Sequence, residues 1–184
     1  MLIQGCWFLL QCMMAKSKAR SKGNINVQLK PFPTQAVVVD SNLFILYLVG
    51  IFKTIEIDLF EKSKQFGEKQ FHLLTKVLGS YKKIIITQPV LTETTNHLDK
   101  LNRKYDTLFY RTILYSLLKF EDSPTKTIDI LNGTAFCTLG FADSSLEILS
   151  SQYVVLTDDD DLYGHIISKK GKAIFWRHLD PKDF

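Results

Sequence analysis

Four short runs of apolar, mostly β-branched residues limit how this chain can fold. Their sequences are AVVVD, KIIIT, YVVLT and AIFW, at residues 36–40, 83–87, 153–157 and 173–176. Short apolar runs without polar alternation are typical of strands buried on both faces of a parallel sheet. Segments with helical spacing separate the four runs, and strands that alternate with helices imply parallel pairing with helices on both faces. The sequence therefore predicts an α/β fold.

Helices are expected between these strands. Residues 41–52 follow the first strand, and Asp40 or Ser41 can cap that helix. Pro89 stands where a first helical residue would, just after the second strand. The other expected helices are residues 56–80, 106–120 with a stripe of Leu108, Thr112, Tyr115 and Leu118, 141–151, and 158–170 closed by Gly171. Residues 121–140 are expected to mix loop and short helix, because they contain Pro124 and Gly133.

The charge of the chain divides it into a basic tail and a nearly neutral domain. The 184 residues suit one domain, and the net charge is +4. Residues 1–35 hold five of the 23 basic residues and no acidic residue, which leaves 18 basic against 19 acidic residues in 36–184. We therefore expect a basic N-terminal tail and linker, residues 1–35, that is disordered, ahead of a single domain, residues 36–184. The tail could contact nucleic acid or an acidic partner, or act only as a solubilising leader.

The cysteines and the apolar N-terminus bear on the compartment. Cys6, Cys12 and Cys137 are odd in number and lack CxxC spacing, which argues against a disulfide framework and a zinc site and favours a reducing, cytoplasmic location. The apolar first fifteen residues are too short to span a membrane. Their basic residues follow the apolar stretch, unlike those of a secretory signal. We interpret this stretch as a non-functional leader, with translation beginning at Met13 or Met14 rather than Met1; a membrane-surface anchor is the alternative.

Acidic residues stand where ligands bind in parallel α/β sheets, which is beyond the carboxyl ends of the strands. Asp40 closes the first strand and the run Asp158–Asp161 follows the third. Glu93 lies six residues after the second strand, and Asp143 opens the helix that leads into the third. Each acid taken singly could cap a helix or interact favourably with the dipole at the start of a helix. Their joint placement on one rim favours a cluster that Mg²⁺ or Mn²⁺ would compensate, and such metals support phosphodiester cleavage.

Four segments resemble the signature segments of the PIN-domain nucleases, in the same order. They are VVVDSNLF, QPVLTETTNHL, GFADSSLEIL and VVLTDDDDL, and the resemblance spans about residues 36–176. It implies a three-layer α/β/α sandwich with a central parallel sheet, an acidic site that binds Mg²⁺ or Mn²⁺, and endonucleolytic hydrolysis of single-stranded RNA. The departures are a long stretch between the first two strands and a one-residue ambiguity between Asp158 and Asp159.

The resemblance also assigns roles to individual residues. Segment matching gives Asp40, Glu93, Asp143 and Asp159 as the catalytic, metal-binding acids, Asp161 as an accessory metal ligand, and Thr157 and Asn42 as auxiliary residues. Basic residues nearby could hold RNA phosphates, although a solvated helix surface is the default interpretation; they are Lys100, Arg103, Lys104 and Arg111. Tyr105, Phe109 and Tyr110 could stack on bases, with core packing favoured for Phe109.

The sequence disfavours several rival functions. A haloacid-dehalogenase-type phosphatase needs a second Asp where Asn42 stands, and no glycine-rich turn supports a dinucleotide or triphosphate site. The alternative left open is a catalytically silent PIN-like scaffold that binds a protein or RNA partner. The resemblance also permits the toxin of a toxin–antitoxin pair, an antitoxin partner and a homodimer, and we expect no membrane association.

Overall fold

A five-stranded parallel sheet forms the centre of the molecule. The computed structural model describes residues 36–123 and 125–179. The strands β1 (Ala36–Val39), β2 (Lys83–Ile86), β3 (Glu121–Asp122), β4 (Val154–Thr157) and β5 (Ala173–Phe175) lie in the order β3-β2-β1-β4-β5, and every neighbouring pair is parallel. The predicted α/β fold is therefore confirmed. The predicted tail, residues 1–35, lies outside the described residues.

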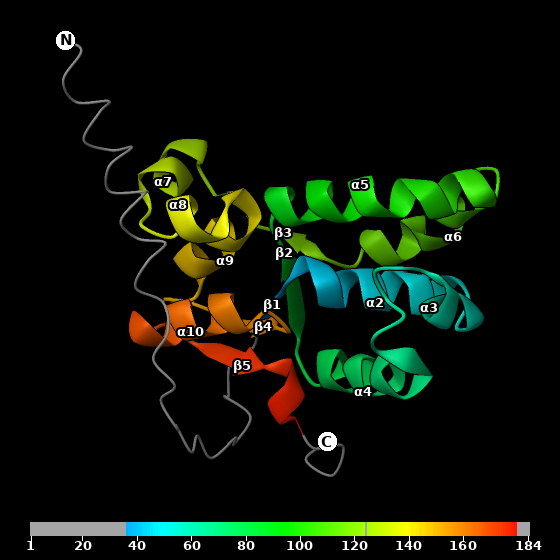
Figure 1. The fold of residues 1–184 in the computed structure, drawn as a ribbon, viewed down its shortest axis with the longest axis horizontal. Helices are drawn as coiled ribbons and strands as arrows, with labels where there is room; N and C mark the ends of the chain where they lie inside the picture. The colour runs from blue at the N-terminus through cyan, green and yellow to red at the C-terminus, as the bar shows by residue number, and fades with distance from the viewer. Residues whose placement is uncertain (1–35, 124, 180–184) are drawn as a thin grey trace.

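Nine helices surround the sheet in the described part of the chain. Figure 1 shows α2 to α6 on one side of the strands and α7 to α10 on the other. Pro89 lies at the start of α5, as predicted, because its missing N–H costs nothing in the first turn. The helices are α2 (Ser41–Phe52), α3 (Ile55–Leu59), α4 (Gly67–Gly79), α5 (Gln88–Lys104), α6 (Leu108–Leu117), α7 (Thr127–Asn132), α8 (Phe136–Leu139), α9 (Phe141–Leu149) and α10 (Asp160–Ser168), with a 3₁₀ turn η1 (Trp176–His178) after β5.

The central strands β1 and β4 supply the middle of the hydrophobic core. Val37 and Val38 of β1 and Val154 and Val155 of β4 are completely buried. Helix α2 packs its apolar residues against this sheet and is buried around most of its circumference, from Leu43 to Val49. Because β1 and β4 are neighbours in register, their carboxyl ends lie side by side and bring the loops that follow them together.

The structure corrects the expected number of strands. Residues 121–140 do contain the short helices α7 and α8, but they begin with β3, which pairs with β2 at the edge of the sheet. This strand has two exposed residues, Glu121 and Asp122, and hence no hydrophobic signal in the sequence. Lys83 of β2 forms an ion pair with Glu121 across the pair.

The expected helix over residues 56–80 is two helices, α3 and α4, separated by a turn. The buried hydroxyl of Ser63 donates to the carbonyl of Ile57 at 2.9 Å, which holds the turn against the end of α3. Gly67 begins α4 with a φ of 77°, a conformation that favours glycine. The apolar positions Phe71, Leu74 and Leu78 do face the core, as predicted.

The expected buried stripe of α6 was wrong. The core face is formed by Phe109 and Ile113, which are fully buried, whereas Leu108, Tyr115 and Leu118 are among the most exposed apolar side chains of the described residues. The helix also begins only at Leu108, because Asp106 and Thr107 before it have positive φ. Both apolar stripes have helical spacing, so only the position of the neighbouring helices decides which one is buried.

The last helix ends differently from the prediction in one detail. Lys170, rather than Gly171, takes the left-handed conformation that closes α10, with a φ of 60°. Gly171 is still required, because a Cβ there would collide with the side chains of Ser150 and Ile166. The amide of Gly171 donates to the carbonyl of Ile166 at 2.9 Å and so closes the last turn.

Two further observations concern the expectations about compartment. No helix in residues 36–123 and 125–179 is long and apolar enough to cross a bilayer. Cys137 takes part in a disulfide bond, which the cysteine count did not lead us to expect.

Candidate active site

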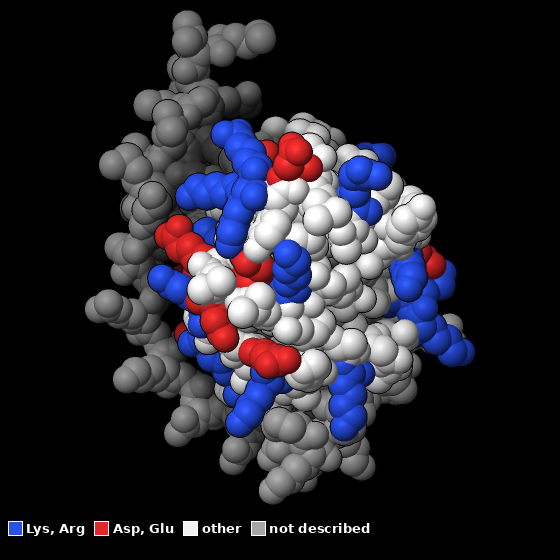
Figure 2. Space-filling model, turned by 90° about the vertical axis from the view of Figure 1, so that its right-hand side faces the viewer, with Lys and Arg blue, Asp and Glu red and all other residues white. Residues whose placement is uncertain are grey.

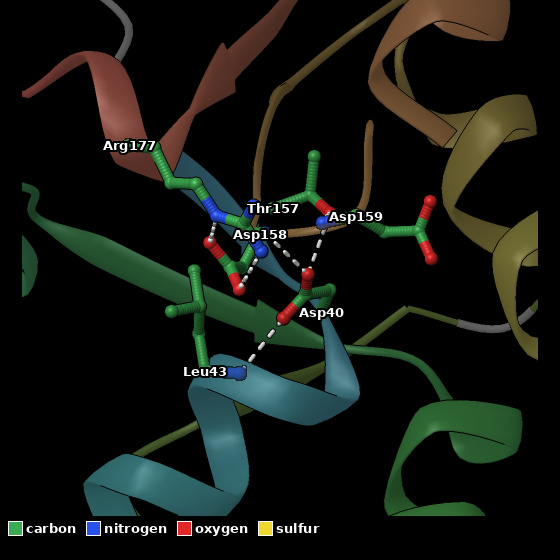
Figure 3. A network of polar contacts seen from close by, with 6 residues as sticks. All are labelled: Asp40, Leu43, Thr157, Asp158, Asp159 and Arg177. Atoms are coloured by element: carbon green, nitrogen blue, oxygen red, sulfur yellow. Dashed lines mark hydrogen bonds and ion pairs between the residues drawn. The ribbon is translucent and has the colours of Figure 1, made fainter. Parts of the chain in front are cut away.

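Asp40 lies at the end of β1, and both of its carboxylate oxygens are bound by the protein. Oδ1 accepts from the amide of Leu43 at 2.8 Å, so Asp40 is the N-cap of α2. Oδ2 accepts from the hydroxyl of Thr157 at 2.5 Å and from the amide of Asp158 at 2.8 Å. Figure 3 shows these contacts, which tie the ends of β1 and β4 together. Burial nevertheless raises the pKa of Asp40 to about 6, against these hydrogen bonds, which lower it.

Thr157 and Asp159 complete the turn after β4. The hydroxyl of Thr157 accepts from the amide of Asp159 at 2.9 Å while it donates to Asp40. Oδ1 of Asp159 accepts from the amide of Leu162 at 2.8 Å, which makes Asp159 the N-cap of α10. In Figure 3 the carboxylate of Asp159 points away from the ion pair of Asp158 with Arg177. The two consecutive aspartates therefore serve different neighbours.

Among the acids of the site, Asp143 in the first turn of α9 has the pKa that is shifted furthest from its ordinary value. Burial is the largest cause, and together with the charges of Asp159, Asp40 and Glu93, in that order, it raises the pKa of Asp143 to about 7. Among the described residues no hydrogen bond reaches the Asp143 carboxylate. The four acids predicted from the sequence are thus close enough to interact electrostatically, and Asp143 lies where they meet.

Glu93 is held on this rim by α5 and by a contact between buried hydroxyls. Thr87, at the end of β2, caps α5 through the amide of Val90 and shares a hydrogen bond of 2.8 Å with Ser145 of α9. This contact fixes the start of α5 against the helix that carries Asp143. The sequence analysis missed Thr87 and Ser145, although Thr87 ends its strand as Thr157 ends β4.

No hydrogen bond within the described residues joins two other predicted site residues, Asp161 and Asn42, to the four acids. Asp161 is exposed in the first turn of α10 and is not among the charges that raise the pKa of Asp143. Asn42 is half-buried in the first turn of α2, directly after the cap Asp40 and Ser41.

Arg177, which the sequence analysis missed, separates the roles of Asp158 and Asp159. Its Nε donates to Oδ1 of Asp158 at 2.9 Å and its Nη2 to Oδ2 at 3.2 Å. The Asp158 side chain is only 5% exposed, so this pair neutralises a buried carboxylate. Asp159 has no such partner in the described residues, and its charge raises the pKa of Asp143. No sequence signal marked Arg177, because it lies 19 residues away after another strand.

The predicted RNA-binding residues are partly occupied by other contacts. Lys104 binds the buried carboxylate of Glu56 at 2.9 and 3.0 Å, and Arg103 forms an ion pair with Asp99 of the same helix at 2.5 Å. Lys100 is exposed on α5, and Arg111 is exposed on α6. The predicted stacking residues are also engaged: Phe109 is fully buried, Tyr105 donates to Glu56, and Tyr110 donates to the carbonyl of Thr95.

Two hollows of similar size open on the described surface. The α3–α5 hollow, of about 300 Å³, lies along α5, and its charged lining consists of Glu56, Glu61, Lys62, Lys100 and Lys104. The α4–η1 hollow, of about 330 Å³, adjoins Asp158 and Arg177. The side that Figure 2 turns toward the viewer carries small groups of Lys and Arg side chains with Asp and Glu among them, rather than one continuous basic patch. Neither hollow is lined by the four acids themselves.

The fit of this site to a divalent cation is mixed. Four carboxylates offer the hard oxygen donors that Mg²⁺ and Mn²⁺ prefer, and among the described residues no hydrogen-bond donor compensates Asp143. However, no three His, Cys, Asp or Glu side chains of residues 36–123 and 125–179 are already grouped as a metal site. Asp40 is directed toward Leu43, Thr157 and Asp158 instead. The donor chemistry therefore fits a cation, but the side chains would have to draw together to bind it.

We compared the chain with known proteins in three ways. No protein-family model, no curated protein and no solved structure matches it. The chain is accordingly placed by its own structure, as an α/β protein with five parallel strands and a carboxylate cluster on their carboxyl rim.

Proposed function

We propose that this protein is a divalent-metal-dependent endoribonuclease that hydrolyses phosphodiester bonds of single-stranded RNA. The observation that carries the proposal is the position of Asp143 near three other acids. Burial raises the pKa of its carboxyl, and the charges of Asp159, Asp40 and Glu93 raise it further. Crowded, desolvated carboxylates are unfavourable for a fold by themselves, and perturbed acids of this kind gather at functional sites. Mg²⁺ or Mn²⁺ would relieve their repulsion.

The residues of the site would share the work in different ways. Glu93, Asp143, Asp159 and Asp40 would hold the cation, with Asp161 as a more distant accessory. When bound, a divalent cation supplies positive charge to the scissile phosphate and lowers the pKa of a water molecule. Thr157 fixes the carboxylate of Asp40 through its 2.5 Å hydrogen bond, and Asn42 lies near enough in sequence to that carboxylate to orient the attacking water.

The resemblance to the PIN-domain nucleases supports the same proposal. Its four segments fall on the end of β1, the start of α5, the start of α9 and the end of β4, which are the places where the four acids lie. We accordingly propose a PIN-like three-layer α/β/α sandwich. A toxin role with an antitoxin partner, a homodimer and a cytoplasmic location are proposals that rest on the resemblance; the disulfide bond of Cys137 does not support the reducing compartment that the cysteine pattern predicted.

Cleavage of labelled single-stranded RNA with Mg²⁺ or Mn²⁺, and with a chelator, tests the proposed activity. We expect cleavage only with metal, and loss of cleavage in Asp143→Asn. Asp129→Asn is the matched control, because Asp129 is exposed on α7 and outside the site. Activity that survives both the chelator and Asp143→Asn, in protein freed of contaminating ribonuclease, would overturn the mechanism.

One observation favours a second candidate, a catalytically silent scaffold that binds RNA or protein. Both oxygens of Asp40 already bind protein donors, and no metal-ready group of side chains exists in the described residues. A melting series with Mg²⁺ and Mn²⁺ distinguishes the two. The enzyme proposal requires the cation to raise the melting temperature of the wild type and not that of Asp143→Asn, whereas in a scaffold neither cation should shift the melting temperature of either protein.

A further inference from the structure

The α4–η1 hollow reaches the carboxyl rim of the sheet at Asp158 and Arg177. It is lined by Gln65 and Phe66 before α4, by Gln70 within α4, and by Asp158, Trp176 and Arg177 beyond the carboxyl ends of β4 and β5. Asp158 joins the two sites, because its amide donates to the catalytic candidate Asp40 at 2.8 Å while its carboxylate binds Arg177. A ligand in this hollow would therefore be linked to Asp40 through one residue, Asp158.

The charge of the hollow favours a neutral polar ligand over a phosphate. The guanidinium of Arg177 is its only cation in the described lining, and the buried carboxylate of Asp158 offsets that charge at 2.9 and 3.2 Å. The α3–α5 hollow differs in this respect, since Lys62 and Lys100 add positive charge there. A phosphate would gain little in a hollow whose charges already cancel, whereas a group that needs hydrogen bonds without charge would be well accommodated.

Hydrogen-bonding groups in the hollow remain available to such a ligand. Nη1 of Arg177 takes no part in the contacts with Asp158, and the Arg177 side chain is 65% exposed. The amides of Gln65 and Gln70 are exposed and bind no other described residue. Phe66 is half-buried and offers an apolar wall. Amide and guanidinium groups beside an aromatic ring are the means by which proteins recognise the edges of unstacked bases in single-stranded RNA.

We propose that the α4–η1 hollow binds one nucleobase of the RNA next to the scissile phosphate, with Gln65, Gln70 and Arg177 reading its edge. The inference rests on the proposed nuclease function and deepens it, because it gives the enzyme a base preference at one position. Asp158 is then a positioning residue: its carboxylate holds the guanidinium of Arg177 in place, and its amide connects the hollow to Asp40.

The first experiment measures base preference in cleavage. A pool of random-sequence RNA is cleaved by the full chain, and the fragment ends are sequenced. The wild type should favour certain bases at one position beside the cut, by roughly five-fold or more if each paired contact discriminates as base contacts usually do. The double variant Gln65→Ala/Gln70→Ala should lose this preference. Gln152→Ala, an exposed glutamine in the turn before β4, should keep it. No preference in the wild type, or an unchanged preference in the double variant, would overturn the proposal.

The second experiment needs no cleavage and so separates this proposal from the nuclease function. In chelator, fluorescence anisotropy gives the affinity of the full chain for labelled oligo(A), oligo(U) and oligo(C). We expect unequal affinities that Gln65→Ala/Gln70→Ala makes equal, with a melting temperature close to that of the wild type because both side chains are exposed. Arg177→Lys should weaken the favoured oligomer most, since a lysine cannot present the same planar donors. Affinity ratios that stay the same in the double variant contradict base recognition here, even if the protein cleaves RNA.

Discussion

Single carboxylates serve both the fold and the proposed chemistry in this protein. Asp40 caps α2 and receives three hydrogen bonds, while Asp143 is half-buried and receives none in the described residues. The pKa values of Asp40 and Asp143 are raised to about 6 and about 7, but the two carboxyl groups have different surroundings. Three hydrogen bonds stabilise the carboxylate of Asp40, whereas no hydrogen bond in the described fold stabilises that of Asp143. We therefore expect substitutions of the two acids to change the stability of the protein in opposite directions.

Asp143→Asn should stabilise the metal-free protein at neutral and higher pH. The folded-state pKa of Asp143 lies above its ordinary value of 3.8, so its contribution to stability is present at low pH and lost as the pH rises toward about 7. Removing the charge should recover roughly 2–4 kcal/mol at most at pH 8. Urea unfolding in chelator at several pH values is the measurement. A variant less stable than the wild type at pH 8 contradicts the described environment of Asp143.

Asp40→Asn should instead destabilise the metal-free protein, although it also removes a buried charge. An asparagine offers one oxygen, so it cannot accept from Leu43 on one side and from Thr157 and Asp158 on the other. At least one buried amide loses its partner, which costs about 1–3 kcal/mol and offsets the relief of charge. Urea unfolding of Asp40→Asn and Asp143→Asn, measured in parallel, compares their free energies of unfolding. Equal changes in the two variants would show that the capping bonds of Asp40 do not contribute to stability.

Among the helices, α2 and α4 approach each other more closely than their sequences reveal. Gly50 of α2 faces the ring of Phe71 in α4, and a Cβ at position 50 would overlap that ring. A close approach of two helices here positions the loop before α4, which carries Gln65 and Phe66 of the α4–η1 hollow. One glycine in a hydrophobic helix thus helps to shape a surface far from it in sequence.

Gly50→Ala should lower the stability of the protein by about 1–3 kcal/mol, because the added methyl group overpacks the contact with Phe71. Gly164→Ala is the matched control: its Cβ would meet nothing within 4 Å, and alanine is the better helix former inside α10, by about 0.5–1 kcal/mol. Urea unfolding should move the two variants in opposite directions. A neutral Gly50→Ala would mean that the two helices have room between them.

At the scale of the whole molecule, basic and acidic side chains lie among one another on the surface that Figure 2 shows. The α3–α5 hollow has three lysines, Lys62, Lys100 and Lys104, against two glutamates, Glu56 and Glu61. Burial is the largest cause that lowers the pKa of His97 in this hollow; Lys62 and Lys100 lower it further, whereas Glu93 and Glu61 raise it. The small excess of positive charge could hold the backbone of an RNA strand.

Lys62→Ala/Lys100→Ala should weaken RNA binding at low salt and flatten its salt dependence. Each lysine–phosphate interaction that the double variant removes should reduce the slope by roughly 0.7 on single-stranded RNA, because fewer counterions are released on binding. Fluorescence anisotropy over a salt series measures the slope, with Lys82→Ala/Lys169→Ala as an exposed, charge-matched control. Equal slopes for the two double variants would place the RNA-binding surface elsewhere, with the basic tail of residues 1–35 as the next segment to test.

The sequence by itself determined the four apolar strands, most of the helices and the positions of the acids at strand and helix ends. These features follow from local patterns, since side-chain spacing and capping residues act over a few neighbouring positions. The tertiary structure decided the rest. It added β3, whose two polar residues become a strand only by pairing with β2, and it selected which of the two apolar stripes of α6 is buried.

It also gave different contacts to Asp158 and Asp159, which look alike in the run of four aspartates. Strands β4 and β5 are parallel neighbours, so the residues that follow them lie at the same rim of the sheet. Arg177 after β5 therefore lies beside Asp158 after β4. The first aspartate is neutralised there, and the second is left to face Asp143. No local pattern contains this distinction, because the charge that makes it comes from another strand of the sheet.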